Sequence, residues 1–570
     1  MGKCFYMRLA WGNIRRSKRI YLPLLIATAV MSCVVMLING LIFSQSLSNM
    51  PSGETAAMVF RMGISVFCIF TFFFMLYING FLIKQRKREF GLYGILGLTK
   101  HQVGKVLFRE NLLLMGGGLI LGGAIANIFG RLLFMALIKL MGEVTGGSFV
   151  ISLPAYLITA ALFAVIFIAI TLLNSFKVRT ASPMELLNSV KSGEKDSRFV
   201  IPLAVIGLIM LAAAYYFAWT IDASGIALGL FFPLALLVII ATYALFTSGS
   251  IALLRLLRKN KRIYYRQKNF VTISAMFHRM RQNARGLATI CILSTMLVVT
   301  LSTTLSLYLG REEMLRAMYP FDVEIQIDEE VVEDRAEEYV SKLNALANER
   351  GVTLSSDESK LIRRVPGQNI GYRNNVVDED DTVIIMDNVI RVGRSLVFDA
   401  EGDFKNCLSF IDAAREAYPE IFTYTANLWI SDIFTSTVEG YGTYGGLLFM
   451  GVFFSILFMC MAVLIIYFKQ ITEGYEDKAQ FAILKNVGMD DRQIRATINR
   501  QILYVFFLPL AAMLLHMVFA ARIQARMLES FMLYDWQLVI ACVGGVCAVF
   551  AVIYLIVYRL TAKVYYDIVK

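Results

Sequence analysis

The sequence predicts a polytopic α-helical membrane protein with ten transmembrane helices, arranged as two four-span repeats plus a two-span insert, and a small α+β extracellular domain. Three observations lead to this prediction. The chain is 57% hydrophobic and only 17% charged, with a mean hydropathy of +0.62, which is typical of polytopic membrane proteins. Ten apolar runs approach the length of about 20 residues that a helix needs to cross a bilayer. One sequence motif also occurs twice, 391 residues apart.

The apolar runs predict the positions of the spans. They cover residues 20–43, 60–83, 110–138, 154–175, 200–220, 226–248, 286–309, 445–468, 501–521 and 536–557. The first run is too long for the apolar region of a signal peptide, and no small-residue cleavage site follows it. We therefore expect the first run to be a span.

Basic residues predict the orientation of the chain. They cluster before the first span, after the second and between the sixth and seventh, whereas residues 44–55 contain no Lys or Arg. Basic loops face the cytoplasm, so we expect both termini to be cytoplasmic. The net charge of +12 then reflects topology, and nucleic-acid binding is not expected.

Residues 311–444 form a long polar segment that we expect outside the membrane. It has 13 Lys and Arg against 27 Asp and Glu, a net charge of −14. Alternating apolar residues over 321–327 predict a strand, and apolar residues at helical spacing over 332–346 predict a helix. Cys407 is the only cysteine in this segment, so it has no disulfide partner there.

The repeated motif predicts a short amphipathic helix that ends at a glycine and is followed by the capped start of another helix. The first copy contains Lys87, Phe90, Tyr93, Leu96 and Gly97, then Thr99 and Gln102; the second contains Lys478, Phe481, Leu484, Val487 and Gly488, then Asp490 and Gln493. Each copy lies between two spans. A short helix at the membrane surface can contact a soluble partner, so two copies suggest two partner subunits; alternatively, both helices merely lie on the lipid interface.

A second, weaker similarity divides the chain. Residues 14–19 resemble residues 280–285, 266 positions later. This spacing is shorter than 391 by about the length of the acidic segment. We therefore predict a first four-span repeat at 1–185, a two-span insert at 198–255, a seventh span at 270–310, the acidic domain at 311–444 and spans eight to ten at 445–570.

Several kinds of chemistry lack a signal in the sequence. The chain has no phosphate-binding loop, and its three histidines are too scattered for a metal site. His516 falls inside a span, where it is either a functional ionisable group or a hydrogen-bonded structural residue. Arg131 either extends to the outer interface or lines a path. No acidic residue lies in the middle of a predicted span, which disfavours a proton- or sodium-driven transporter.

Glycines between 116 and 130 in the third span predict close helix packing. Residues 88–99 (REFGLYGILGLT), this glycine-rich span and residues 179–187 (RTASPMELL) resemble the FtsX-like permeases of ABC transporters. Residues 467–478 (YFKQITEGYEDK), 487–489 (VGM) and 506–510 (FFLPL) are more narrowly similar to the bacitracin-resistance type of permease in Gram-positive bacteria. The acidic domain is shorter than is usual in that type, so the drug recognised is not implied.

The resemblance implies a permease that binds no cofactor itself and works with two ABC ATPase subunits, which would hold the ATP and Mg. It also implies protection of wall lipids from antimicrobial peptides, frequently with a sensor histidine kinase. The repeated helices would then dock the ATPases through Glu89, Phe90, Tyr93, Leu96, Gly97, Phe481, Leu484, Val487, Gly488 and Met489.

Two other functions remain open at this stage. The chain could act as a co-receptor that reports peptide load to the kinase, or as a mechanical regulator of a cell-wall hydrolase. The acidic run Asp378, Glu379, Asp380 and Asp381 is a candidate site for a cationic peptide or its wall-lipid complex, or simply a solvated face.

Overall fold

The computed structural model describes residues 3–142, 149–180, 200–259, 267–319, 321–328, 333–355, 361–363, 393–422, 428–486 and 491–569. Within these ranges, ten helices are long and apolar enough to cross a membrane. Each of them overlaps one of the ten predicted spans, so that prediction is confirmed. The acidic run 378–381 and residues 487–490 of the second motif lie outside the described residues.

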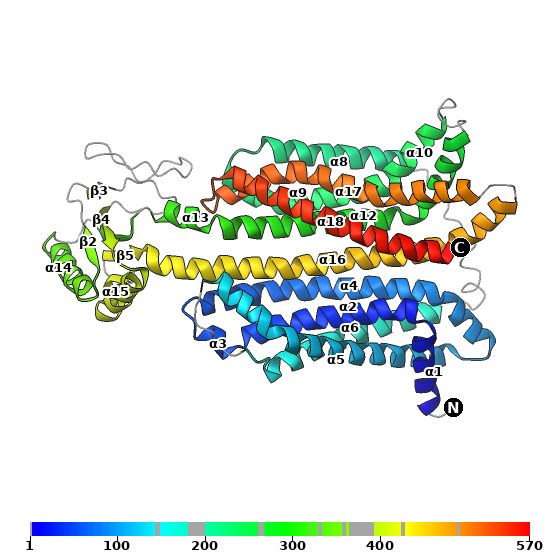
Figure 1. Ribbon diagram of the computed structural model, residues 1–570, viewed down its shortest axis with the longest axis horizontal. Coiled ribbons are helices and arrows are strands. Elements are labelled where there is room, and N and C mark those ends of the chain that lie inside the picture. Colours follow the sequence, from blue (N-terminus) through cyan, green and yellow to red (C-terminus); the bar gives the residue numbers. More distant parts are fainter. Residues whose placement is uncertain are drawn as a thin grey trace.

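The spans form a bundle in which one long helix lies between two groups (Figure 1). The first group is α2 (Lys18–Ile42), α4 (Gly53–Ile95), α5 (Lys100–Leu140) and α6 (Leu153–Thr180). The second is α8 (Val200–Thr220), α9 (Ser224–Ala244), α12 (Gln267–Leu309), α17 (Asp491–Glu529) and α18 (Trp536–Val569). The helix between them, α16 (Ile433–Asn486), packs against both α4 and α12.

Shorter elements connect or flank the spans. They are α1 (Lys3–Arg16), α3 (Gln45–Ser48), a π-helical turn (Leu245–Gly249) and α10 (Ser250–Lys259). In Figure 1, α1 runs across the direction of the spans, at the same end of the bundle as the C-terminus. We call this end the termini end.

Two glycines allow α5 to pack closely against α2. A Cβ atom at Gly122 would lie 2.1 Å from Ser32 Oγ and 2.6 Å from the carbonyl oxygen of Ala29. A Cβ at Gly118 would lie 2.4 Å from Thr28 Cγ2, and the Ser32 hydroxyl donates to the carbonyl oxygen of Gly118 at 3.2 Å. This geometry confirms the predicted role of the glycines and is typical of helix pairs in membranes.

A small α+β domain lies at the opposite end of the bundle (Figure 1). It contains α13 (Arg311–Met318), β1 (Val323–Asp328), α14 (Glu333–Glu349), β2 (Thr353–Ser355), β3 (Leu361–Arg363), β4 (Gly393–Glu401), α15 (Phe404–Ala417), a 3₁₀ turn (Pro419–Phe422) and β5 (Leu428–Asp432). The predicted strand at 321–327 and helix at 332–346 correspond to β1 and α14.

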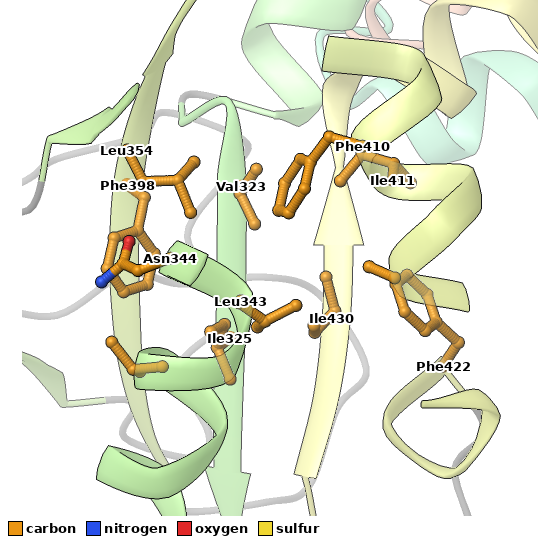
Figure 2. A pocket seen from close by; sticks show the side chains of 12 residues that line it. Val323, Ile325, Leu343, Asn344, Leu354, Phe398, Phe410, Ile411, Phe422 and Ile430 are labelled. Atoms are coloured by element: carbon orange, nitrogen blue, oxygen red, sulfur yellow. The ribbon is translucent and has the colours of Figure 1, made fainter. Parts of the chain in front are cut away.

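The strands form an antiparallel sheet in the order β2-β4-β1-β5, with β3 also paired to β4. Figure 2 shows apolar side chains of the sheet, including Val323, Ile325 and Ile430, facing Leu343 of α14 and Phe410 of α15. The space left between them is only about 10 Å³, so this is a packed core with no room for a ligand. Cys407 is buried in this core as a free thiol.

Both copies of the repeated motif differ from the prediction in one respect. Residues 87–95 are the last turns of α4, which continues from the span, and residues 478–486 are the last turns of α16. The prediction of a separate short helix was therefore wrong. The physical reason in the first copy is that residues 84–89 (KQRKRE) contain no Gly or Pro, so nothing there ends the helix before the motif. In the second copy α16 continues through Gly474, because a single glycine costs a helix only about 1 kcal/mol.

Two ionisable residues in the spans have simple placements. Both ring nitrogens of His516 have hydrogen-bond partners: the hydroxyl of Tyr215 lies 2.5 Å from Nδ1 and that of Thr242 lies 3.1 Å from Nε2. His516 is thus a hydrogen-bonded residue joining α17 to α8 and α9. Arg131 is exposed on α5.

We expect Gly122→Leu to destabilise the protein, because the new side chain would overlap the backbone of α2. Overpacking of this kind costs about 1–3 kcal/mol, and the contact with a backbone carbonyl leaves little room for relief. Gly116→Leu is the matched control, since a Cβ at Gly116 of the same helix meets nothing within 4 Å. Thermal unfolding in detergent should show a lower midpoint for Gly122→Leu alone; equal midpoints would contradict the packing argument.

Candidate functional site

The candidate site is the turn between α4 and α5 at the termini end of the bundle. Gly97 ends α4 with a φ of +88°, a left-handed conformation that glycine adopts without strain. The amide of Leu98 donates to the carbonyl of Tyr93 at 3.0 Å and the amide of Gly97 to that of Gly94 at 3.2 Å, which is the Schellman arrangement. The glycine stop predicted from the sequence is therefore confirmed.

The start of α5 is capped as predicted. The amide of Gln102 donates to the Thr99 hydroxyl, and the amide of Thr99 donates to the Gln102 side chain at 2.9 Å. These reciprocal bonds form a capping box, which satisfies amides that the first turn of a helix leaves free. With only the turn 96–99 between them, α4 and α5 are rigidly joined.

A buried ion pair joins α4 and α5 close to this turn. Arg86 of α4 is fully buried and donates through Nη1 and Nη2 to the two carboxylate oxygens of Glu110 of α5, the second bond being 3.1 Å. Its Nε donates to Glu89 at 2.7 Å. Burial is the largest single influence on Arg86 and would lower its pKa, but the charge and hydrogen bonds of Glu110, with smaller contributions from Tyr21 and Glu89, together outweigh it and hold that pKa above its ordinary value. The guanidinium therefore stays charged.

The ion pair joins four helices. Asn13 of α1 donates to Glu110 at 2.7 Å and accepts from the Tyr93 hydroxyl at 3.2 Å. The guanidinium carbon of Arg86 also lies 5.2 Å from the ring centre of Tyr21 in α2 and 5.0 Å from that of Phe90, distances typical of cation–π contacts. We call Arg86, Glu110, Asn13, Tyr21 and Phe90 the arginine cluster.

The five residues predicted for the first docking helix differ in how exposed they are. Phe90 is only 4% exposed because it packs in the arginine cluster, so the expectation that it fills a partner's groove was wrong for this conformation. Tyr93 is half-buried, and the Glu89 side chain is 40% exposed. Leu96 is 70% exposed and, next to Gly97, remains accessible to a partner.

Two accessible residues were missed by the sequence analysis. Leu92 is 51% exposed and Ile95 is 64% exposed; with Leu96 they form an apolar surface that we call the turn patch. Their spacing of three and four residues places them on one side of the helix, and this spacing was the signal that could have identified them. The residues expected to dock, Phe90 and Tyr93, instead occupy the buried side of the same turns of α4.

In the second copy, Phe481 and Leu484 lie in the last turns of α16. Their side chains, and Val487, Gly488 and Met489 altogether, lie outside the described residues. The second predicted docking surface therefore has a known position at the end of α16 but no described contacts.

The other end of α16 is fixed directly to the sheet. β5 ends at Asp432 and α16 begins at Ile433, and the buried Asp432 carboxylate accepts from the amide of Thr435 at 2.6 Å. Burial raises the pKa of Asp432, partly offset by this bond. The predicted domain boundary at residue 444 therefore falls inside α16.

A second connection lies beside the first. Arg311, at the start of α13, lies between the rings of Tyr308 in α12 and Tyr441 in α16, 4.3 Å from each ring centre. The Tyr441 hydroxyl also donates to Glu312 at 3.2 Å. These contacts hold α12, α13 and α16 together where they enter the α+β domain. Among the described residues, no group of three or more His, Cys, Asp or Glu could hold a metal ion.

Comparison with known proteins identifies the type of chain. The family described as FtsX-like permease C-terminal matches residues 61–183 and 452–565. An uncharacterized ABC transporter permease of Bacillus subtilis, YvcS, is 23% identical over 96% of both chains. The ABC transporter permease protein YxdM of the same organism is 23% identical over 91% of this chain and 93% of its own length.

Two further relatives have a more specific name. The bacitracin export permease protein BceB of Bacillus subtilis is 28% identical over 42% of this chain and 38% of its own length. Its counterpart from Halalkalibacterium halodurans is 26% identical over 49% of this chain and 45% of its own length. With ten apolar helices among the described residues, the chain is a multi-pass membrane protein that carries FtsX-like permease sequence in each half.

Proposed function

We propose that this chain is the permease subunit of an ABC transporter that confers resistance to antimicrobial peptides. In this proposal, ATPase subunits dock at the termini end, on the cytoplasmic side, and the α+β domain acts outside on a peptide or a peptide–wall-lipid complex. The observation that carries the proposal is the uninterrupted helix α16, which joins the motif at the termini end to the sheet at the other.

The length of α16 suits it to transmit motion. Its 54 residues, at a rise of about 1.5 Å each, span about 80 Å. It lies between the two groups of helices and contacts both, and no flexible linker separates it from β5. A displacement of its docking end would therefore move the sheet.

The sheet connects the ends of two spans, α12 and α16, so relative motion of these spans acts on it. β1 follows α12 and α13, β5 leads into α16, and β1 and β5 are paired antiparallel, with Val323 opposite Asp432. If α12 and α16 shift against each other, the strain falls on this strand pair and on the Arg311 contacts. Mechanical coupling of this kind needs no channel for a substrate through the bundle.

Two ATPase subunits are supported by the duplication. The two stretches that match the permease family begin at residues 61 and 452, the same spacing of 391 residues that separates the two motifs. Each stretch contains one copy of the motif, placed between two long helices. The turn patch then supplies the apolar contact of the first docking site, and the end of α16 that of the second.

Resistance to peptides is supported by two observations. Two relatives are named as bacitracin export permeases, and residues 311–444 carry a net charge of −14, which would attract cationic peptides over about 8 Å at physiological salt. The packed sheet core excludes binding inside the domain, so we propose that the ligand binds on its surface.

We expect Ile95→Glu with Leu96→Glu to abolish docking of the ATPase without unfolding the permease, since both side chains are exposed. Loss of apolar anchors at an interface can cost about 2–4 kcal/mol. The control is Phe404→Glu, an equally drastic change at a residue 43% exposed on α15 at the other end of the molecule. Co-purification with the ATPase measures the effect, and normal co-purification of the double variant would refute docking at the turn patch.

We also expect Glu110→Gln to destabilise the permease by about 3–5 kcal/mol, because it leaves the charge of Arg86 buried with only the peripheral Glu89. Replacing both partners, Arg86→Met with Glu110→Leu, removes the uncompensated charge and should restore most of the thermal stability.

Comparing the two variants shows whether the arginine cluster serves only the stability of the fold or also the transmission of motion. If the arginine cluster transmits motion from the α4–α5 turn, the double variant should bind ATPase and remain folded but lose peptide-stimulated ATP hydrolysis. Normal stimulation in the double variant would show that the ion pair serves stability only.

A further inference from the structure

A large basic cavity at the termini end is not used by any step described above. Its volume is about 400 Å³, and it lies between α5, α6 and α1. Lys100, His101, Lys105 and Arg109 line it from α5, opposite Thr171 and Ser175 of α6. The α5 side chains offer positive charge on one wall and Ser175 offers a hydroxyl on the other, whereas the Thr171 hydroxyl already donates to the carbonyl of Phe167 and accepts from Asn111.

The lining of the cavity brings no carboxylate to Lys105 and Arg109. None of the described residues that line it is an Asp or Glu. The nearby Glu110 is committed elsewhere, because its two oxygens accept bonds from Arg86 and Asn13. Arg109 stacks over Tyr6 at 5.1 Å, yet its Nη1 is buried without a hydrogen-bond partner. A buried donor of this kind indicates a missing acceptor.

The cavity has charged and apolar parts. From Lys100 to Leu112, α5 rises about 18 Å; the lining is basic at the end of the helix, with Lys100, His101 and Lys105, and further in it combines Arg109 with Phe108 and Leu112. Both of these apolar side chains are exposed, Phe108 by 51% and Leu112 by 44%. An anionic group followed by a hydrocarbon chain would match both parts.

The neighbouring helix α1 places the cavity at the membrane surface. It runs across the spans (Figure 1) and buries Tyr6 and Ala10 against the bundle, while Phe5, Met7 and Trp11 are 43%, 40% and 59% exposed. Met7 and Trp11 are four residues apart and therefore share one side of the helix. A helix that exposes apolar side chains and carries several basic residues lies in the membrane interface. Met7 also lines the cavity, so lipid headgroups of the leaflet on that side are at its level.

We propose that this cavity binds an anionic membrane lipid, with the lipid phosphate held by Lys105 and Arg109 and the start of an acyl chain along Phe108 and Leu112. Basic recesses between transmembrane helices are known to suit such headgroups. The bound lipid would tie α1 to α5 beside the arginine cluster. This proposal needs only the membrane location of the chain and is independent of which substrate the permease handles.

The test is native mass spectrometry of the full-length protein with phosphatidylglycerol or phosphatidylcholine of identical acyl chains. We expect retention of phosphatidylglycerol only. Lys105→Gln should weaken binding about fivefold, and Lys105→Gln with Arg109→Gln about 25-fold, from the usual contribution of one basic residue near an anionic lipid. Arg131→Gln is the matched control, because it removes an exposed charge from α5 far from the cavity.

A second variant tests the cavity without changing its charge. A Cβ at Gly104 lies in ordinary contact with Ser175, 3.6 Å from its Oγ, so Gly104→Leu should fold while filling the space, and it should release phosphatidylglycerol. This variant also avoids the contact of Arg109 with Tyr6.

Three results would overturn the proposal. The first is equal retention of the two lipids or unchanged binding by the variants. The second is full displacement of the lipid by millimolar inorganic phosphate, which would show a site for free phosphate. The third is loss of ATPase binding by Lys105→Gln with lipid binding intact, which would make the cavity a protein contact.

Discussion

The buried contact between Arg86 and Glu110 is the interaction on which the geometry of the candidate site depends. Two charges removed from water are unfavourable unless each is paired and its remaining hydrogen-bonding capacity is satisfied. Here the requirement is met by residues from three helices: Glu89 on α4, Glu110 on α5 and Asn13 on α1. Because these bonds need defined positions, they fix how α1, α4 and α5 meet below the turn patch.

This constraint explains why the turn patch can be apolar and exposed without collapsing onto the bundle. Phe90 and Tyr93 are held inward by Arg86 and Asn13, so the opposite side of the same helical turns must face outward. The Schellman turn at Gly97 and the capping box at Thr99 pair the backbone groups of Tyr93, Gly94, Gly97, Leu98, Thr99 and Gln102 and so stabilise this conformation of the loop. A partner that presses on the patch would act on a rigid unit, and the displacement would pass into α4 and α5 together.

The sequence predicted the features that depend on local patterns. Apolar run length predicted the ten spans, alternation predicted β1, and Gly97, Thr99 and Gln102 predicted the turn, because each of these signals acts within a few residues. The arginine cluster could not be predicted, because Glu110 is 24 positions from Arg86 and 97 positions from Asn13. Nothing in the chain marks these residues as partners. The burial of Phe90 is a consequence of that cluster, so the motif residues were identified while the side they face was not.

The two copies of the motif also differ in a way that affects coupling. At the spacing of 391 residues, the positions of Arg86 and Glu110 correspond to Asp477 and Gln501. An aspartate and a neutral amide cannot form the same ion pair, so the second copy of the sequence does not contain a second arginine cluster. The second copy instead lies at the end of α16, which reaches the sheet directly, whereas α4 begins near α3, short of the sheet (Figure 1). The first motif is therefore braced within its own half, and only the second has a continuous helix to the α+β domain, so equal movements at the two turns would not have equal effects at the far end.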